Sequence, residues 1–160
     1  MNYNDIALWL ENNKVLGNKS EIYSDTVPKG DFLSQSVKSG DKVYEGSTIN
    51  INYSLGKEPS TEFKNALKKA ESYSKTMNMS KQGIYDQLTS QYGEKFPSDA
   101  AQYAIDNINV DFKINALEKA KSYQKTMSMS KSAVYDQLIS KHGEKFTAEE
   151  AQYAVDHLDD

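Results

Sequence analysis

Hydrophobic residues recur at helical spacing through the second part of the chain, and the same pattern is written there twice. One stretch covers residues 65–107 and the other covers residues 115–157, at a constant offset of 50 residues. Identical residues occupy 27 of the 43 aligned positions. A fixed period without internal gaps is typical of one supersecondary unit repeated in tandem.

The pattern in each repeat predicts three helices. The first runs from about residue 62 or 111 to residue 77 or 127. The second follows the N-cap serines Ser80 and Ser130 and ends near residues 92 and 142, and the third starts after residue 96 or 146. The apolar positions that both copies share predict the core faces of these helices. They are Leu67/Leu117, Ala70/Ala120, Tyr73/Tyr123, Met77/Met127, Tyr85/Tyr135, Leu88/Leu138, Ala101/Ala151, Ala104/Ala154 and Ile105/Val155.

Helix ends have their own signals. Gly93 and Gly143 stand where the second helices are expected to stop, in the left-handed conformation that glycine adopts at little cost. Residues 147–150, Thr-Ala-Glu-Glu, predict a capping box for the third helix of the second copy. The first copy has proline in place of that threonine, so Ser98 is expected to cap instead.

The first part of the chain predicts an α+β module. Ile6, Trp9 and Leu10 fall on one face of a short helix that ends near residue 13. Strands are expected around residues 20–23, 32–37 and 49–53, the last with the clearest alternation. The predicted organisation is therefore one helix on a small three-stranded sheet at 1–57, a polar linker at 58–61, and two all-α, helix-turn-helix-like three-helix repeats at 62–109 and 110–160.

Composition narrows the function classes. All 19 basic residues are lysine, and the net charge is -4, which argues against a general nucleic-acid binder. The absence of cysteine excludes disulfides, thiolate metal sites and thiol nucleophiles. No apolar run approaches the ~18 residues of a membrane-spanning helix, and the first residues do not form a signal peptide.

Residues 27–56 resemble a PASTA domain. They contain a Val-Pro-x-Gly turn from Val27, a strand that ends Ser-Gln-Ser, and Gly-Ser-Thr from Gly46 before a strand that ends Ser-x-Gly. The family usually opens with a short strand ahead of its helix, which this sequence lacks. The resemblance covers residues 1–57 and implies an extracellular module of the bacterial envelope that associates with peptidoglycan or cell-wall fragments. A spacer that binds no ligand remains the alternative.

The repeats resemble the Ltp family of host cell surface-exposed lipoproteins. The shared signature is Asn-Ala-Leu-x-Lys-Ala-x-Ser-Tyr, then Met-x-Met-Ser, Tyr-Asp-Gln-Leu, Gly-Glu-Lys-Phe and Ala-Gln-Tyr-Ala-x-Asp. Members occur in Gram-positive bacteria and their phages, and some act in superinfection exclusion by stopping DNA delivery from a second phage. The resemblance implies a location at the cell surface or wall. Those lipoproteins carry a signal peptide and a lipidated cysteine, so membrane attachment is expected only through an anchor that this chain does not contain.

The third helices provide the candidate binding site. They carry acidic residues and no lysine, which predicts a protein-binding acidic face for a basic partner. The family resemblance implies that this partner is a phage protein. The face comprises Asp99, Asp106, Glu149, Glu150 and Asp156, flanked by Tyr103 and Tyr153. The ordinary preference for acids at helix N-termini explains three of these residues without any partner. It does not explain Asp106 and Asp156, which lie near C-terminal ends.

Two other functions are weighed against surface binding. A DNA-reading helix needs basic residues for phosphates, and the acidic third helices would repel them, so DNA binding is a remote alternative. The sequence contains no nucleophile–base pair, phosphate loop or metal-ligand spacing that would support catalysis. Both histidines belong to the second copy, and the first copy has other residues at their positions. The sequence thus predicts a non-enzymatic surface protein with no cofactor or metal. The main alternative is a wall-architecture or spacer protein that binds peptidoglycan or surface components.

Overall fold

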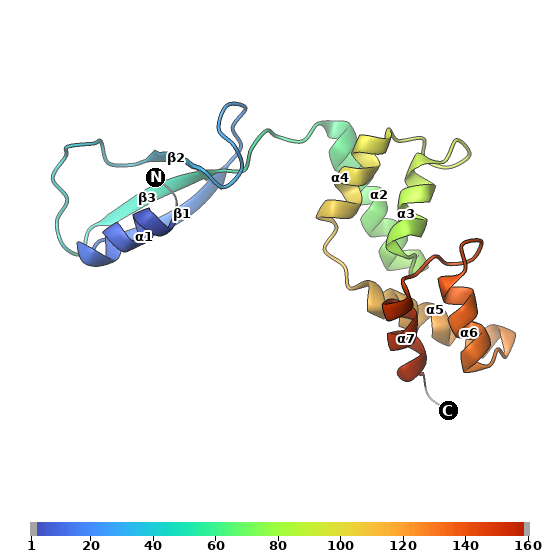
Figure 1. The fold of residues 1–160 in the computed structure, drawn as a ribbon. Coiled ribbons are helices and arrows are strands. Elements are labelled where there is room, and N and C mark those ends of the chain that lie inside the picture. The colour runs from blue at the N-terminus through green and yellow to red at the C-terminus, as the bar shows by residue number, and fades with distance from the viewer. Residues whose placement is uncertain (1–2, 159–160) are drawn as a thin grey trace. The chain divides into compact units, whose positions relative to one another are not determined.

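The structure, a computed structural model, describes residues 3–158 and divides the chain into two compact units, 1–59 and 60–160. The first unit contains one helix and a three-stranded sheet, and the second contains six helices (Figure 1). This confirms the predicted fold class of an α+β module followed by helical repeats.

The first unit has the element order α1 (Tyr3–Asn12), β1 (Leu16–Ile22), β2 (Phe32–Gln35) and β3 (Thr48–Ser54). The sheet order is β1-β3-β2. Strand β1 runs parallel to β3, whereas β2 runs antiparallel to it. Because a parallel pair needs a long crossover, the chain returns to β3 through residues 23–47 and forms β2 on the way.

The core of this unit lies between α1 and the sheet. Ile49, Ile51 and Tyr53 alternate along β3 and are buried, together with Ile6 from the helix. Gly17 lies directly under the helix, where a β-carbon would come 2.5 Å from Leu10 Cδ1. A glycine at this position therefore lets α1 pack against β1.

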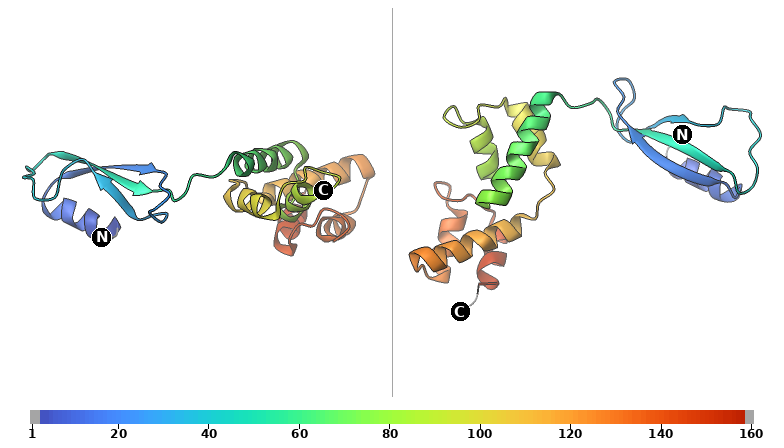
Figure 2. Two further views of the ribbon diagram at one scale, coloured as in Figure 1. Left: turned by 90° about the horizontal axis from the view of Figure 1, so that it is seen from above. Right: turned by 180° about the vertical axis from the view of Figure 1, so that it is seen from behind.

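The second unit is made of two similar trios of helices. The first comprises α2 (Thr61–Met77), α3 (Lys81–Thr89) and α4 (Ser98–Asn107), and the second comprises α5 (Phe112–Met127), α6 (Lys131–Ile139) and α7 (Ala148–Asp156). Figure 2 shows each trio as its own bundle. Each also has its own buried core. In the first trio, Ala66 and Ala70 of α2 are buried with Ala101 and Ala104 of α4, and such small side chains let helices approach closely.

Most of the predicted core is confirmed, with one exception in each trio. Met77 and Met127 are half exposed or more, at 50% and 64%. The helices end at these residues, and the next residues, Asn78 and Ser128, take the left-handed conformation. Met79 and Met129, two positions later, pack against the cores instead. The predicted helix ends are therefore right, but the last apolar residue of each helix does not face the core.

The predicted helix starts are partly confirmed. Ser80 and Ser130 cap α3 and α6 by accepting from the N–H groups three residues on. The capping box of Thr147 and Glu150 is present. The prediction for Ser98 is wrong: it lies inside α4, Pro97 is the N-cap, and no side chain caps the helix.

The predicted role of Gly93 and Gly143 is also wrong. Helices α3 and α6 end earlier, at Thr89 and Ile139, and neither glycine has a positive φ. The left-handed residues of these loops are Lys95 and Lys145, with φ of 60° and 61°. Glycine is needed because the loop folds tightly against the end of the helix. A β-carbon at Gly93 or Gly143 would lie 2.4 or 2.6 Å from the carbonyl oxygen six residues earlier.

Candidate functional site

The acidic face predicted from the sequence lies on α4 and α7, the equivalent third helices of the two trios. Its best candidates, Asp106 and Asp156, are exposed in the last turn of each helix. Each carboxylate accepts from a glutamine one turn earlier, at 3.0 Å from Gln102 and 2.7 Å from Gln152. The partial negative charge of a helix C-terminus disfavours a carboxylate there. No structural need of the helix therefore explains these two charges.

The other acidic residues have local roles. The Glu149 carboxylate lies 2.6 Å from Lys113 Nζ, and Glu150 accepts from the Thr147 N–H in the capping box. The hydrogen bond from Lys113 lowers the pKa of Glu149, and the same contact raises the pKa of Lys113. In the first copy Asp99 accepts only a local bond from its neighbour's N–H, at 2.9 Å. The charge of α7 is thus partly neutralised at its N-terminal end.

The two flanking tyrosines are half buried and differ in their surroundings. The Tyr103 ring packs against Phe63, with ring centroids 5.3 Å apart. The Tyr153 ring stacks on His157 at 4.0 Å, and Lys113 Nζ lies 5.9 Å from its centroid. Position 63 of the first copy is phenylalanine where position 113 of the second is lysine. The first copy therefore presents an apolar ring where the second presents a cation.

The structure distributes the acidic residues between the two trios. Over residues 3–158, no three acidic or histidine side chains come close enough to share a metal ion. Asp106 lies 3.9 Å from Lys81 Nζ, and both of these groups are about half exposed, so the pair is weak. The five acidic residues therefore lie on two separate helices, two on α4 and three on α7.

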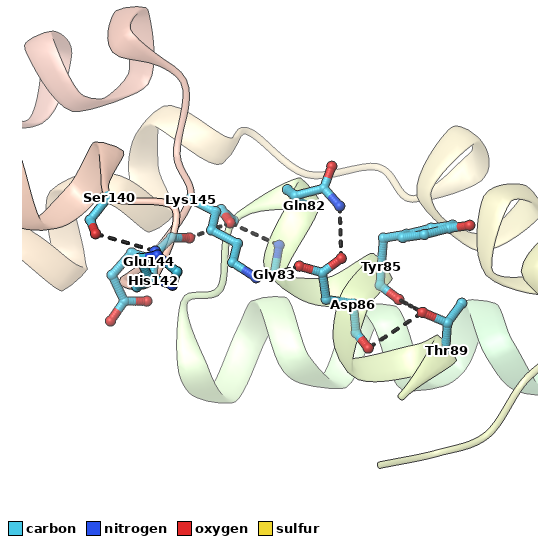
Figure 3. Close-up of polar contacts among 10 residues, drawn as sticks. Gln82, Gly83, Tyr85, Asp86, Thr89, Ser140, His142, Glu144 and Lys145 are labelled. Atoms are coloured by element: carbon cyan, nitrogen blue, oxygen red, sulfur yellow. Dashed lines mark hydrogen bonds and ion pairs between the residues drawn. The ribbon is translucent and has the colours of Figure 1, made fainter. Parts of the chain in front are cut away.

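The two trios are joined by polar contacts that the sequence did not reveal. Lys145 Nζ lies 2.5 Å from the Asp86 carboxylate, and the Ser80 hydroxyl donates to the Glu144 carbonyl at 2.5 Å. Figure 3 shows the loop of the second trio lying against the start of α3. The Asn115 side-chain amide donates to Ser74 Oγ at 2.8 Å and to the Met79 carbonyl at 2.9 Å. Ser74, Ser80 and Asn115 are buried, so their hydrogen bonds hold one trio against the other, whereas the side chains of the Lys145–Asp86 pair are 34% and 40% exposed.

A second polar cluster recurs in both trios and ties the loop to the first helix. The Tyr73 hydroxyl donates to Glu94 at 2.6 Å, and Lys69 Nζ lies 3.0 Å from the same oxygen. These contacts, that of Tyr73 first, lower the pKa of Glu94, and the carboxylate raises the pKa of Tyr73 and of Lys69. Tyr123 donates to Glu144 at the same distance in the second copy. The repetition and half-burial of the cluster indicate a structural role.

The first unit offers a separate candidate site. A groove of about 260 Å³ lies beside α1 and the loop that follows β2. Its walls are mainly apolar, from Ile6, Trp9 and Val37, with Lys38 and Asp41 also among its lining residues. Trp9 is 45% exposed. An exposed indole beside polar groups is a common feature of ligand-binding surfaces.

Both histidines lie at the surface. His157 stacks on Tyr153, and the His142 N–H donates to Ser140 Oγ at 3.3 Å. Within the described residues, none of the helices is both long enough and apolar enough to cross a bilayer.

Comparison with known proteins agrees with this architecture. The profile of the host cell surface-exposed lipoprotein family, Ltp, matches residues 61–108 and 111–158, and that of the PASTA domain matches residues 1–55. Because the lipoprotein profile covers more than half of the sequence, the chain belongs to the Ltp family, with a PASTA domain preceding its two Ltp repeats.

Two relatives illustrate the two parts. The solved structure of Ltp, a superinfection exclusion protein from the Streptococcus thermophilus temperate phage TP-J34, shares 45% sequence identity with this chain at a TM-score of 0.59. The match covers 64% of this chain and 100% of that one. A protein named as a probable serine/threonine-protein kinase of Clostridium perfringens (strain 13 / Type A) is 45% identical over 47 residues. That segment is 29% of this chain and only 7% of the kinase.

Proposed function

We propose that this protein acts at the outer surface of a Gram-positive cell, without catalysis, and blocks the entry of phage DNA. The observation that carries the proposal is its 45% identity to a superinfection exclusion protein over that protein's whole solved chain. The Ltp repeats would perform the exclusion, and the PASTA domain would associate with the cell wall.

The partner of the repeats is proposed to be a basic segment of an incoming phage protein. Helices α4 and α7 carry five acidic residues and no lysine within Ser98–Asn107 and Ala148–Asp156. Two opposite charges 4 Å apart attract by only about 1 kcal/mol in water. Several exposed carboxylates are therefore needed, and binding should weaken steeply as salt is raised.

Asp106 and Asp156 are proposed as the main contacts. They are exposed and occur at the same position of both copies, each beside a neutral glutamine. The Lys81 ammonium lies 3.9 Å from Asp106, and because both groups are about half exposed it engages that carboxylate only weakly. Glu149 and Glu150 contribute less because a lysine and a backbone N–H already engage them.

Phage DNA entry tests this function directly. Cells that display the chain through an added lipid anchor should adsorb phage normally but take up less phage DNA than cells that display an unrelated anchored protein. Unchanged uptake across a broad panel of phages would refute exclusion.

A second candidate function is wall architecture, in which the repeats join or space surface components. The PASTA domain and its groove beside Trp9 favour this reading. Purified peptidoglycan should retain the full chain but not a chain truncated to residues 60–160. Retention of the full chain together with undiminished phage DNA entry would favour architecture over exclusion. If peptidoglycan retained both chains equally, the PASTA domain would act only as a spacer.

A further inference from the structure

The junction between the two trios joins two different surfaces of the repeat. The first trio contributes the serine surface, formed by Met79, Ser80 and Asp86. The second contributes the lysine loop, Glu144 and Lys145, which is supported by Asn115. Since both trios are copies of one unit, each has both surfaces, and the chain uses only one of each. Such head-to-tail contacts do not close by themselves.

The two unused surfaces keep the residues that make the junction. The second trio has Met129, Ser130 and Asp136 at the positions of the serine surface. The first has Glu94 and Lys95 in its loop, with Asn65 at the position of Asn115.

Some neighbouring positions differ between the two surfaces. Gln82, whose amide donates to the Asp86 carboxylate at 2.8 Å, is replaced by Ser132 in the second trio. A β-carbon at Gly83 would lie 3.1 Å from Ser80 Oγ, a close contact, and 3.8 Å from the Glu144 carbonyl oxygen, an ordinary one. Ala133 stands at the equivalent position, and the Ser130 hydroxyl there still caps its helix. Gln124 replaces Ser74, and its amide oxygen can accept a hydrogen bond as the hydroxyl does.

Burial shows that one set of surfaces is occupied and the other is not. Ser80 is 1% exposed, whereas Ser130 is exposed. Asn115 is 7% exposed, whereas Asn65 is exposed. The unoccupied surfaces are nevertheless already shaped. Ser130 caps its helix as Ser80 does, and Lys95 has the backbone conformation of Lys145, with φ of 60° and 61°.

We propose that a second copy of this chain docks its Lys95 loop on the Ser130–Asp136 surface and thereby repeats the internal junction between molecules. Lys95 would pair with Asp136, the Ser130 hydroxyl would donate to the Glu94 carbonyl, and Asn65 would reach the Met129 carbonyl. A second copy is the favoured occupant because the chain itself seats this same loop on the same surface of its first trio. Repetition of the contact gives open-ended strings of molecules.

The association is weak in dilute solution. Within the chain, a short connection supplies the partner at an effective concentration of the order of millimolar. Separate molecules lack that connection, so strings form only near such concentrations or where many copies crowd one surface.

Sedimentation equilibrium of the full chain tests the proposal at concentrations up to about 1 mM. The weight-average mass should rise above 18.0 kDa with concentration. Asp136→Lys alone and Lys95→Asp alone should each remain monomeric, because each brings two like charges together. An equimolar mixture of the two variants should associate again, because each contact then pairs a lysine with an aspartate. Lys125→Asp and Glu71→Lys, which make the same charge changes outside both surfaces, should associate like the parent.

Several results would overturn the proposal. A parent chain that stays monomeric up to that concentration would do so, as would single variants that associate normally. A mixture that fails to restore association would show that the lysine and aspartate do not face each other. Circular dichroism of each variant distinguishes lost association from lost folding, because both substituted residues are exposed and the helical spectrum should not change.

Discussion

Removing the amide of Asn115 should separate the contribution of the junction from that of the helices themselves. Asn115 is 7% exposed and donates two hydrogen bonds across the junction, at 2.8 and 2.9 Å. Each bond contributes about 0.5–1.5 kcal/mol net, so Asn115→Ala should cost about 1–3 kcal/mol. The higher helix propensity of alanine stabilises the helix by roughly 0.5 kcal/mol and offsets part of this loss. The expected loss in free energy of unfolding is therefore about 0.5–2.5 kcal/mol.

The chain supplies its own control in Asn65, the same residue at the same position of the first repeat, which is exposed. Asn65→Ala should leave stability within about 0.5 kcal/mol of the parent, because only the propensity gain applies there. Urea unfolding followed by circular dichroism at 222 nm reports mainly on the helical repeats. Fluorescence of Trp9, the only tryptophan, reports on the first unit and should not change. Equal effects of the two substitutions would refute the role given to Asn115.

Three further substitutions, and a control at Ser98, test particular contacts by urea unfolding. Gly143→Ala should cost about 1–3 kcal/mol, because the added methyl group would meet a backbone carbonyl; an unchanged midpoint would contradict this. Thr147→Ala should cost about 1 kcal/mol, whereas Ser98→Ala should cost little, because only the threonine caps a helix; similar losses would be inconsistent with the two caps. Tyr73→Phe should destabilise most at neutral pH. The lowered pKa of Glu94 gives stability that is fully present above its ordinary pKa of 4.5 and is lost as pH falls through the lowered pKa. The raised pKa of Tyr73 gives stability that is present below its ordinary pKa of 10.0 and is lost as pH rises through the raised pKa. The variant and parent should therefore converge at both extremes, and a pH-independent difference would argue against this coupling.

The helical repeats were predictable because their signals are local. Apolar spacing, the N-cap serines and the capping box each act within one or two turns, and the sequence shows them twice. The predictions fail where one local signal is compatible with more than one structure. Met77 continues the apolar spacing of α2 but lies at its last residue, half exposed. Gly93 suggested a left-handed helix end, although glycine is required there for a close backbone approach.

Other features depend on contacts between distant residues. Strand β1 was expected only around residues 20–23 but extends over Leu16–Ile22. All seven of its residues are exposed, so no alternation marks it, and pairing with β3 defines its length. Asn115 and Asn65 look the same in the sequence, yet only one is buried, because the junction uses each surface of the repeat once. The Lys113–Glu149 pair likewise joins two helices whose packing the sequence does not specify.

In the function that we propose, acidic residues of the two Ltp repeats block phage DNA entry by engaging a basic partner. It is tested most directly by measuring phage DNA uptake in cells that display equal amounts of the anchored parent chain, the double variant Asp106→Lys/Asp156→Lys, or a control. The control, Glu62→Lys/Glu71→Lys, makes the same change in net charge outside the acidic face. The parent and the control should reduce DNA uptake, and the double variant should lose most of this protection. Full protection by the double variant would contradict it.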